Sequence, residues 1–258
     1  MSAIIRPLTE GDLATARRIC STAFGTFLGA PEPESFWGDR DYVYGRFGSE
    51  HVASFAAELD GELVGSNFAT RWGSVGFFGP ITVRPDRQGQ GIAKQLLEAV
   101  NTQLNEWSVR HAGLFTFPHS ALHLGLYQKF GFHARFLTAI MAAPARRGGA
   151  AGSWARYSEL AEADRREVTE ALYEGLDLGG EIRTVAARGL GDTLLLWAGT
   201  SRLVGFAVCH WGPRVRPAKA VVLSNLVRCG RGPPPRVISP SSSTLVPPSP
   251  WRSACQIC

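Results

Sequence analysis

The sequence predicts an α+β fold, in which a mixed, mostly antiparallel central sheet is flanked by helices and followed by a partial second copy. A β-branched strand, a glycine-rich turn and an amphipathic helix follow one another between Gly79 and Leu97. Before them, two strand-like runs are joined by Asp60-Gly61, a dipeptide typical of β-hairpin turns. Short stretches of the first half recur in the same order after residue 157, which indicates the second copy.

The other elements of the first half are short apolar runs and amphipathic stretches. Thr9 has the residue type of a helix N-cap, and Gly131 has that of a C-cap. Pro85 cannot donate a ladder hydrogen bond, so we expect the strand before the glycine-rich turn to end near Arg84. The predicted elements are strands at 4–7, 51–59, 63–70, 81–83, 114–117 and 132–141, and helices at 9–25, 91–111 and 121–130.

The glycine-rich turn, Gln88-Gly89-Gln90-Gly91, leads directly into a helix whose apolar residues recur every four positions. Its glycines allow the backbone to approach a ligand closely or to adopt positive φ. The first N–H groups of a helix have no partner within the helix, and the helix dipole places partial positive charge there. The turn therefore predicts an anion site that suits a pyrophosphate. The periodic residues are Ile92, Leu96, Leu97, Val100 and Leu104.

Two common pyrophosphate-binding patterns do not fit this turn. No Gly-Lys-Ser/Thr follows the glycines, and Ala93-Lys94 stands where a dinucleotide fingerprint has its third glycine. The stretch resembles instead the acyl-coenzyme-A loop of the GNAT superfamily of N-acetyltransferases. That loop reads Gln/Arg-x-x-Gly-x-Gly/Ala after a strand ending in Val-x-Pro. Here Gln88-Gly89-Gln90-Gly91-Ile92-Ala93 follows Val83-Arg84-Pro85.

The resemblance implies acetyl-coenzyme A as cosubstrate and no metal ion. The pantetheine arm would lie beside the strand formed by Ile81, Thr82 and Val83 as an added strand. An ordinary strand-to-helix turn is the competing interpretation, and the position of the motif between strand and amphipathic helix favours the cofactor loop. The backbone groups expected to hold the pyrophosphate belong to Gln88, Gly89, Gln90, Gly91, Ile92 and Ala93.

A second motif strengthens the resemblance. Leu126-Tyr127-Gln128-Lys129-Phe130-Gly131-Phe132 is similar to the Leu-Tyr-x-Lys-x-Gly-Phe segment of the family. In that family the tyrosine acts as a general acid, and the resemblance gives this role to Tyr127. A neutral tyrosine with a pKa near 10 can protonate a departing thiolate. The oxyanion that forms first needs a donor, which we expect to be a backbone N–H between Ile81 and Val83.

The sequence departs from the family in two places. The family often has Asn about seven residues before the tyrosine, where this chain has Ser120. Many members also carry a carboxylate on the central strand as general base, and residues 76–80 contain none. His119, whose residue type titrates near neutral pH, and Glu58 are the two candidates for this role. The base therefore stays unassigned.

Residues 25–50 are rich in Gly, Pro, aromatic and acidic residues. By resemblance, this region forms part of the wall of the acceptor site, where such a lining would suit a cationic amine. Large aromatic side chains are more often core packing, and we favour that interpretation for most of them. The residues concerned are Phe27, Phe36, Trp37, Tyr42, Tyr44, Phe47, Glu32, Glu34, Asp39 and Asp41.

Composition argues for a soluble globular protein. The chain has 258 residues, 45% of them hydrophobic, and a net charge of +5 that is spread along the sequence. Because no run of Lys or Arg occurs, we expect no nucleic-acid partner, and because no apolar run is long enough, no membrane association. The N-terminus does not read as a signal peptide. Five sparse cysteines make no disulfide framework, and Cys255 and Cys258 lack a second pair for zinc, so we expect a cytoplasmic protein.

The second half repeats the beginning of the first. Leu160-Ala161-Glu162-Ala163-Asp164 resembles Leu8-Thr9-Glu10-Gly11-Asp12, and Leu203-Val204-Gly205 repeats Leu63-Val64-Gly65. No second glycine loop and no second tyrosine motif follow. The expected organisation is a complete GNAT-like domain at 1–143, a linker at 144–157, a partial second GNAT-like domain at 158–223 and a tail at 224–258.

The tail is crowded with Pro and Ser, a composition that cannot bury enough apolar surface to order itself. It reads either as a disordered interaction tail or as the frame-shifted or truncated continuation of the second domain. We favour the second interpretation, because the composition changes abruptly where a second glycine loop is due. Resequencing of the coding region in independent isolates tests this hypothesis, and an uninterrupted reading frame would contradict it.

The sequence as a whole predicts an N-acetyltransferase that transfers an acetyl group from acetyl-coenzyme A to a primary amine by direct attack on the thioester. The acceptor is a small molecule or a peptide, and its identity and the oligomeric state stay open. Two alternatives are a non-catalytic acyl-coenzyme-A-binding regulatory module, favoured by the missing carboxylate, and a degenerate scaffold domain. Retained binding without turnover would indicate the first, and failure to bind coenzyme A would indicate the second.

Overall fold

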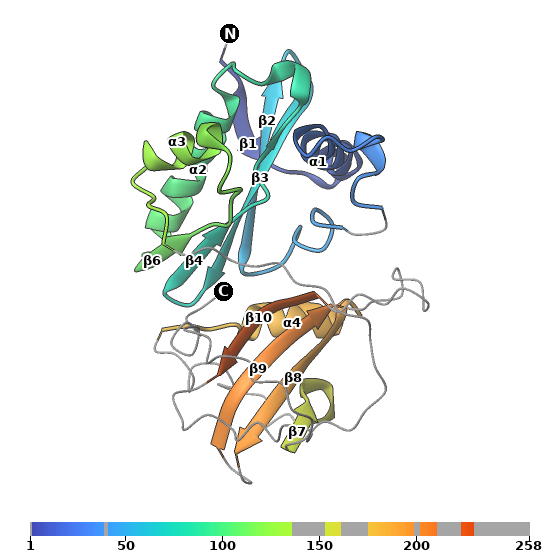
Figure 1. Ribbon diagram of the computed structural model, residues 1–258, viewed down its shortest axis with the longest axis vertical. Coiled ribbons are helices and arrows are strands. Elements are labelled where there is room, and N and C mark those ends of the chain that lie inside the picture. The colour runs from blue at the N-terminus through green and yellow to red at the C-terminus, as the bar shows by residue number, and fades with distance from the viewer. Residues whose placement is uncertain are drawn as a thin grey trace, which may run out of the picture.

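The computed structural model describes residues 2–38, 41–135, 153–160, 175–198, 202–210 and 223–229. These residues form two sheets, one from the first half of the chain and one from the second (Figure 1). Within the described segments, no helix is long and apolar enough to cross a bilayer.

The first sheet is antiparallel except at one edge. Its strands lie in the order β1-β2-β3-β4-β6, and β5 pairs with β3 beyond the end of β4. Only β6 runs parallel to its neighbour, β4, among the strands that the structure describes. This arrangement confirms the predicted mixed, mostly antiparallel sheet. The strands are β1 (Ile4–Pro7), β2 (Val52–Leu59), β3 (Glu62–Trp72), β4 (Val75–Phe78), β5 (Thr82–Val83) and β6 (His111–Gly113).

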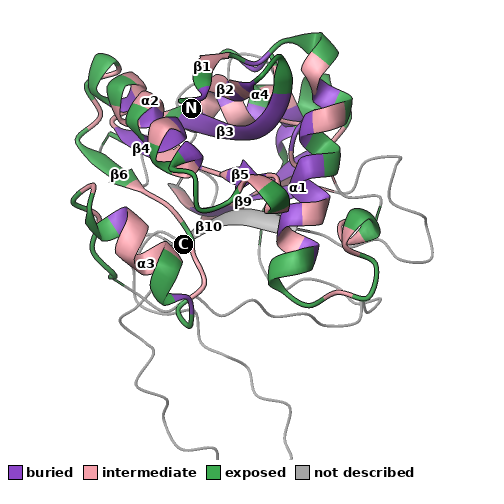
Figure 2. Ribbon diagram, turned by 90° about the horizontal axis from the view of Figure 1, so that it is seen from above, coloured by how far each residue is buried: buried purple, intermediate pink, exposed green. Residues whose placement is uncertain are grey.

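Helices cover both faces of this sheet (Figure 1). α1 (Leu13–Phe27) lies on one face, and α2 (Ile92–Glu106) and α3 (Ala121–Gln128) lie on the other. Successive side chains of a strand point to opposite faces, so Ala56 of β2 packs with α1 while the next residue, Ala57, packs with α2. Between these layers β3 is buried along nearly its whole length (Figure 2). Short 3-10 turns lie at Glu10–Asp12 (η1), Pro33–Ser35 (η2) and Pro85–Arg87 (η3).

The apolar face predicted for the helix after the glycine turn is confirmed. Ile92, Leu96, Val100 and Leu104 of α2 are all buried against the sheet. The helix ends at Glu106 and not near His111, because Ser108 adopts the left-handed conformation with φ of 53° and the chain then turns into β6.

The strand predicted at 114–117 is wrong, because the strand of this region begins three residues earlier, at His111. The parallel pairing with β4 involves His111, Ala112 and Gly113, which face Val75, Gly76 and Phe77. Residues 114–117 continue outside any strand, and their apolar side chains pack instead against the core and α1. Among the residues that the structure describes, no strand lies beside the edge of β4 beyond Phe77. Of the predicted strand at 132–141, residues 132–135 are not a strand and the rest lies outside the described residues.

β4 and β5 are one strand interrupted by a bulge. Phe78 lies opposite Ala69 of β3, and Thr82 lies opposite Ser66, so three residues between these pairs on one strand face two on the other. The extra residue falls at Gly79-Pro80, where Gly79 has φ of 128° and its N–H donates to the carbonyl of Phe68. A bulge of this kind bends the strand and changes the direction in which its backbone N–H and C=O groups point.

The second sheet has four antiparallel strands in the order β7-β8-β9-β10, with α4 (Gly179–Ala187) and the 3-10 turn η4 (Tyr157–Glu159). β7 begins at Ser153, inside the stretch expected to be a linker, so the second unit starts earlier than predicted. β10 reaches Cys229, so the first residues of the predicted tail are also a strand. The strands are β7 (Ser153–Arg156), β8 (Gly191–Ala198), β9 (Arg202–His210) and β10 (Leu223–Cys229). The helix predicted after Leu160 and residues 230–258 lie outside the described residues.

The two hairpins have the same register, which supports the partial second copy. In the first, Gly65 lies opposite Ala57, and the register shifts immediately after Ala57. In the second, Gly205 lies opposite Leu196, and the register shifts immediately after Leu196. Ala57 and Leu196 are each the sixth residue of an eight-residue strand. The repeated Leu-Val-Gly therefore marks structurally equivalent positions.

The turn that opens α1 is held by a charged network. Asp12 accepts hydrogen bonds from the Thr9 N–H at 2.8 Å and from two guanidinium nitrogens of Arg6 at 2.7 and 3.0 Å. The Arg6 hydrogen bonds, opposed by burial, hold the pKa of Asp12 well below its ordinary value. A carboxyl whose folded pKa is depressed stabilises the fold above its unfolded pKa, near 4, and loses this contribution as the pH falls.

We therefore expect Asp12→Asn to lower the free energy of unfolding at pH 7 by about 1–3 kcal/mol. The difference from the unmodified chain should shrink between pH 5 and pH 2. Urea unfolding followed by circular dichroism across this range measures both effects, and a difference independent of pH would contradict the assignment.

Candidate functional site

The glycine-rich turn is exposed and lies at the N-terminus of α2. Gly91 is the N-cap residue with φ of 77°, and Gly89 has φ of 79°. A Cβ placed on either glycine would meet no atom within 4 Å, so the space in front of both is open. The N–H groups of the first turn of α2 have no hydrogen-bond partner within the helix, and the two glycines lie directly before them. The arrangement is that of an anion site.

The strand that leads to the turn is fixed from both ends. Thr82 and Val83 pair with Ser66 and Gly65 of β3. The Gln88 side chain donates to the carbonyl of Val83 at 3.2 Å, which ties the turn back to the strand. A Cβ on Gly65 would lie 2.7 Å from the carbonyl oxygen of Thr82, so only glycine permits this close pairing.

Tyr127 lies on α3 and is 7% exposed. Its ring contacts Phe78 with ring centroids 6.0 Å apart. Burial raises the pKa of Tyr127 to about 12, while a hydrogen bond with the Thr116 side chain acts in the opposite direction. The phenol is therefore neutral throughout the physiological range and can act only as a proton donor.

One residue links the turn to the tyrosine. Ile81 packs against the cluster that contains Val83 and Ile92, and also against the cluster that contains Tyr127 and Phe78. The structure thus brings the predicted strand, the first turn of α2 and the predicted acid into one continuous packed region. The bulge at Gly79-Pro80 directly precedes Ile81 in this region.

Asn67 of β3 was not identified from the sequence. It lies between Ser66 and Phe68, at the point where β3 passes the bulge. Its Oδ1 accepts the N–H of Phe68 at 2.9 Å, and its fully buried Nδ2 has no hydrogen-bond partner among the described residues. The side-chain oxygen thereby caps an N–H beside the bulge. An amide side chain inside a long strand of a buried sheet is the one sequence signal that could have indicated it.

Ser120 explains one departure from the family pattern. It is the N-cap residue of α3, and its hydroxyl accepts the N–H of His123 at 3.4 Å. Serine and asparagine are both strong N-cap residues, so Ser120 can fix the start of this helix as an asparagine would.

The two candidates for the general base lie in different places. Glu58 of β2 forms an ion pair with Arg6 at 2.7 Å, two strands away from β4. His119 is exposed and stacks on Phe27, with ring centroids 5.8 Å apart. A second histidine that the sequence reasoning missed, His123, lies one turn before Tyr127 on α3. Burial and the nearby His119 lower the pKa of His123 from its ordinary value.

The aromatic residues of 25–50 divide into two groups. Trp37 and Phe47 pack against the core beneath α1, as we expected for most of them. Phe27 and Tyr44 are each 39% exposed, and Phe27 contacts Phe117 at 4.9 Å between ring centroids. Asp41 accepts the N–H groups of Val43 and Tyr44, so it shapes its own loop.

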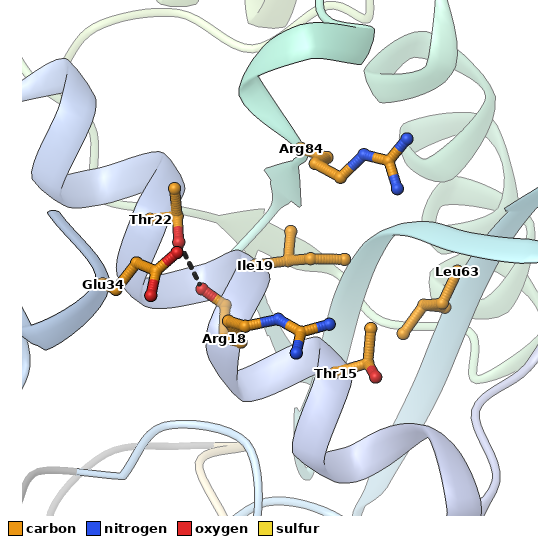
Figure 3. A pocket seen from close by; sticks show the side chains of 7 residues that line it. All are labelled: Thr15, Arg18, Ile19, Thr22, Glu34, Leu63 and Arg84. Carbon is orange, nitrogen blue, oxygen red and sulfur yellow. Dashed lines mark hydrogen bonds between the residues drawn. The ribbon is translucent and has the colours of Figure 1, made fainter.

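A small pocket lies on the α1 side of β5 (Figure 3). Its volume is about 160 Å³, which is below the range of pockets that enclose a cofactor. Thr22 and Arg18 of α1 line it and are joined through a hydrogen bond from the Thr22 hydroxyl to the Arg18 carbonyl at 2.9 Å. The pocket contains neither the glycine turn nor Tyr127. Its other lining residues are Thr15, Ile19, Glu34, Leu63 and Arg84.

Comparisons with known proteins agree with this geometry. Residues 20–132 match the model of the acetyltransferase (GNAT) family. The match begins within α1 and spans the bulged strand, the glycine turn, α2 and the tyrosine motif. No curated protein gives a significant match to the sequence.

Several solved structures are similar over the first half of the chain. The PaiA N-acetyltransferase from Thermoplasma acidophilum, in complex with coenzyme A, is 18% identical with a TM-score of 0.47, over 52% of this chain and 92% of that one. The aminoglycoside acetyltransferase HMB0005 from an uncultured soil metagenomic sample is 20% identical with a TM-score of 0.46, over 56% and 100%. The ribosomal-protein-S18-alanine N-acetyltransferase from Escherichia coli is 22% identical with a TM-score of 0.41, over 52% and 79%.

The family match and the sheet lead to the same assignment. The matched segment contains a mixed sheet, a glycine turn at a helix N-terminus and a buried tyrosine on the following helix. This chain therefore carries a domain of the GNAT acetyltransferase family over residues 20–132.

Proposed function

We propose that the first half of the chain, about residues 1–143, transfers an acetyl group from acetyl-coenzyme A to a primary amine. The observation that carries the proposal is the open, exposed glycine turn in front of α2, placed beside a bulged strand and a buried neutral tyrosine. The acetyltransferase family supplies the class of reaction. Residues 144–157 would connect this domain to the second unit, with the strand at Ser153–Arg156 belonging to the latter.

The turn would hold the pyrophosphate of acetyl-coenzyme A through backbone groups. Gly89 and Gly91 leave the approach free of side chains, and the dipole of α2 favours negative charge at this end. The contributing backbone is that of Gln88, Gly89, Gln90, Gly91, Ile92 and Ala93. No metal ion is required for this mode of binding.

The pantetheine arm would occupy the edge of β4 and β5 beside which the described residues place no further strand. β6, the strand that pairs with β4, ends at Gly113, and the bulge at Gly79-Pro80 changes the direction of the backbone near Ile81. An extended amide chain can pair there with Ile81, Thr82 and Val83 as an added strand. A backbone N–H beside the bulge would then face the thioester carbonyl and stabilise the oxyanion.

Tyr127 would complete the reaction as general acid. The amine attacks the thioester carbon, the tetrahedral oxyanion collapses, and the C–S bond breaks with its electron pair on sulfur. A thiol has a reference pKa near 8.5 and is therefore a stronger acid than a phenol. The thiolate can accept a proton from a neighbouring neutral phenol only within a close hydrogen bond. Burial keeps Tyr127 neutral and therefore ready to donate.

The test is a calorimetric titration of acetyl-coenzyme A into the full chain and into Gly91→Trp. We expect micromolar binding by the unmodified chain and a Kd at least ~30-fold higher in the variant, because the indole would fill the open space in front of α2. Coenzyme A release with a panel of amines then tests turnover.

Gly61→Trp provides the matched control. Gly61 has φ of 79° and open space around it, as Gly91 does, but lies in the β2–β3 turn. Equal loss of binding in both variants would indicate backbone strain and not occlusion of a site. Absence of binding by the unmodified folded chain would overturn the proposed function, and binding without turnover would indicate a regulatory module.

A further inference from the structure

An aromatic and imidazole surface lies between the end of α1 and the start of α3. It consists of Phe27, Phe117, His119 and His123, and we call it the ring cluster. Phe27 contacts both histidines, with ring centroids 5.8 Å from His119 and 4.9 Å from His123. Phe117 lies 4.9 Å from Phe27 and 6.4 Å from His123 by the same measure. Phe27 and His119 are exposed, so the cluster opens to solvent.

The ring cluster is continuous with the expected acid. His123 precedes Tyr127 by four residues on α3, so the two side chains lie on the same helix face one turn apart. Thr116, whose side chain hydrogen-bonds with Tyr127, is the residue before Phe117. The cluster therefore adjoins the place where the departing sulfur would receive its proton.

His123 is held in position from several sides. Its backbone N–H donates to the hydroxyl of Ser120, and its ring lies against Phe27 and Phe117. Its Nδ1 is buried and has no hydrogen-bond partner in the part of the chain that the structure describes. Since a protonated imidazole would need a partner at both nitrogens, this environment favours the neutral ring. A neutral imidazole is a base that can accept a proton near pH 7.

We propose that the ring cluster is the acceptor subsite, that it receives primary amines carrying an aromatic group, and that His123 takes the proton that the amine must lose. This inference rests on the proposed function and adds the missing base and the class of acceptor.

The bound ammonium gives one proton to the imidazole of His123, which passes it to water. The nitrogen lone pair forms the C–N bond, and the C–S bond breaks with its electrons on sulfur. Sulfur takes the proton of Tyr127, and the second proton of the nitrogen restores the phenol. The products are the amide, coenzyme A as thiol and one proton in solution.

The lining favours aromatic amines over polycations. Phenyl and imidazole faces offer stacking and cation–π contacts, which together hold a ring and its adjoining ammonium. The four members of the cluster include no carboxylate, whereas a polyamine or an aminoglycoside would need several. An apolar surrounding also lowers the pKa of a bound ammonium, which brings it closer to that of an imidazole.

The groups that face His123 determine its pH dependence. α1 presents the phenyl ring of Phe27, the segment before α3 presents Phe117 and His119, and α3 itself presents Tyr127 one turn away. His119 is the titratable neighbour that acts on His123, and like charge on the two rings is unfavourable. His123 should therefore stay a base down to a pH below 6.5.

The experiment measures kcat/KM for phenethylamine against pH, with the unmodified chain and His123→Gln. With the unmodified chain, we expect a plateau from about pH 7 to the pKa of the amine, since His123 deprotonates the ammonium. With His123→Gln, kcat/KM at pH 7 should fall about 100-fold and rise about tenfold per pH unit, because only the free amine then reacts. A plateau in both proteins would overturn the role of His123.

Three comparisons separate the possible failures. His111→Gln makes the same change at an exposed position in β6 and should leave the profile unchanged. Phe27→Ala should raise the KM of phenethylamine about tenfold and leave that of butylamine within about twofold; equal effects would overturn the aromatic subsite. Efficient use of butylamine or an aminoglycoside in place of phenethylamine would overturn the acceptor class and leave the acetyltransferase intact. Acetyl-coenzyme A binding without turnover of any amine would count against the proposed function itself.

Discussion

Tyr127→Phe should lower kcat about 100- to 1000-fold, while the Kd for acetyl-coenzyme A stays within about twofold of the unmodified value. The substitution removes one hydroxyl and keeps the ring that contacts Phe78. Without a proton donor the thiolate must leave unprotonated, and this raises the barrier for C–S cleavage alone. Rapid-quench or coupled thiol assays measure kcat, and calorimetry measures the Kd.

The control for this variant is an equally buried tyrosine in the second unit. Tyr157 is also 7% exposed and lies in η4, among the core residues of the second unit. Tyr157→Phe should leave kcat unchanged. If Tyr127→Phe and Tyr157→Phe reduce activity equally, the effect is structural and Tyr127 is not the acid. If Tyr127→Phe retains full kcat, another donor protonates the sulfur.

The parts of this site that the sequence predicts are those set by local spacing. The four-residue period after Gly91 fixes the buried face of α2, and Pro85 fixes the end of β5. Positive φ at Gly89 and Gly91 follows from their residue type within a tight turn. Tyr127 is buried against Phe78 and Leu97 of other elements, so its burial does not follow from its neighbours on α3.

The parts that the sequence does not predict depend on contacts between distant segments. Leu114 and Phe117 are as apolar as strand residues, but the edge of β4 pairs with His111–Gly113 instead. The bulge at Gly79-Pro80 can be identified only from the pairing of β4 and β5 with β3, which shows the extra residue. His123 is unremarkable in the sequence and becomes a candidate base through Phe27, which lies 96 positions earlier and contacts its ring.

β10 of the second sheet pairs with its neighbour in the same way as β5 of the first sheet. Cys229 at the end of β10 lies opposite Gly205, as Val83 at the end of β5 lies opposite Gly65. The pairing of β10 with β9 also contains an extra residue, between Ser224 and Val227, comparable to the bulge before β5. β10 thus repeats the strand that leads to the glycine turn in the first sheet. The sequence that follows contains Pro233-Pro234-Pro235 and no counterpart of Gln88-Gly89-Gln90-Gly91.

The second unit contacts the first sheet, and we expect these contacts to stabilise that sheet. The β3–β4 turn contacts the chain before α4: Ser74 donates its N–H to the carbonyl of Gly175 at 2.7 Å, and Asp177 donates to that of Trp72 at 3.3 Å. Gly73 has φ of 66°, and a Cβ there would lie 2.5 Å from the Gly175 oxygen. Between the two units His51 Nε2 lies 2.9 Å from Glu181 Oε2. Arg183 also pairs with Glu50.

Val75→Asp tests this support and should lower the free energy of unfolding by more than ~3 kcal/mol. Val75 belongs to β4, yet it is 9% exposed because it packs among Leu176, Leu178 and Ile182 of the second unit. A carboxylate there would be buried without a cation. Urea unfolding followed by circular dichroism measures the change.

Ile4→Asp, in β1 of the same sheet, is the control, because Ile4 is 64% exposed and the same charge stays hydrated there. We expect this control to change the free energy of unfolding by less than ~0.5 kcal/mol. Since Val75 begins the strand that continues into the bulge and β5, the Val75 variant should also weaken acetyl-coenzyme A binding under conditions where it is still folded. An unchanged free energy of unfolding in Val75→Asp would show that the two units fold independently. The expected loss of stability, with unchanged acetyl-coenzyme A binding by the folded variant, would show that the bulged strand keeps its position without the second sheet.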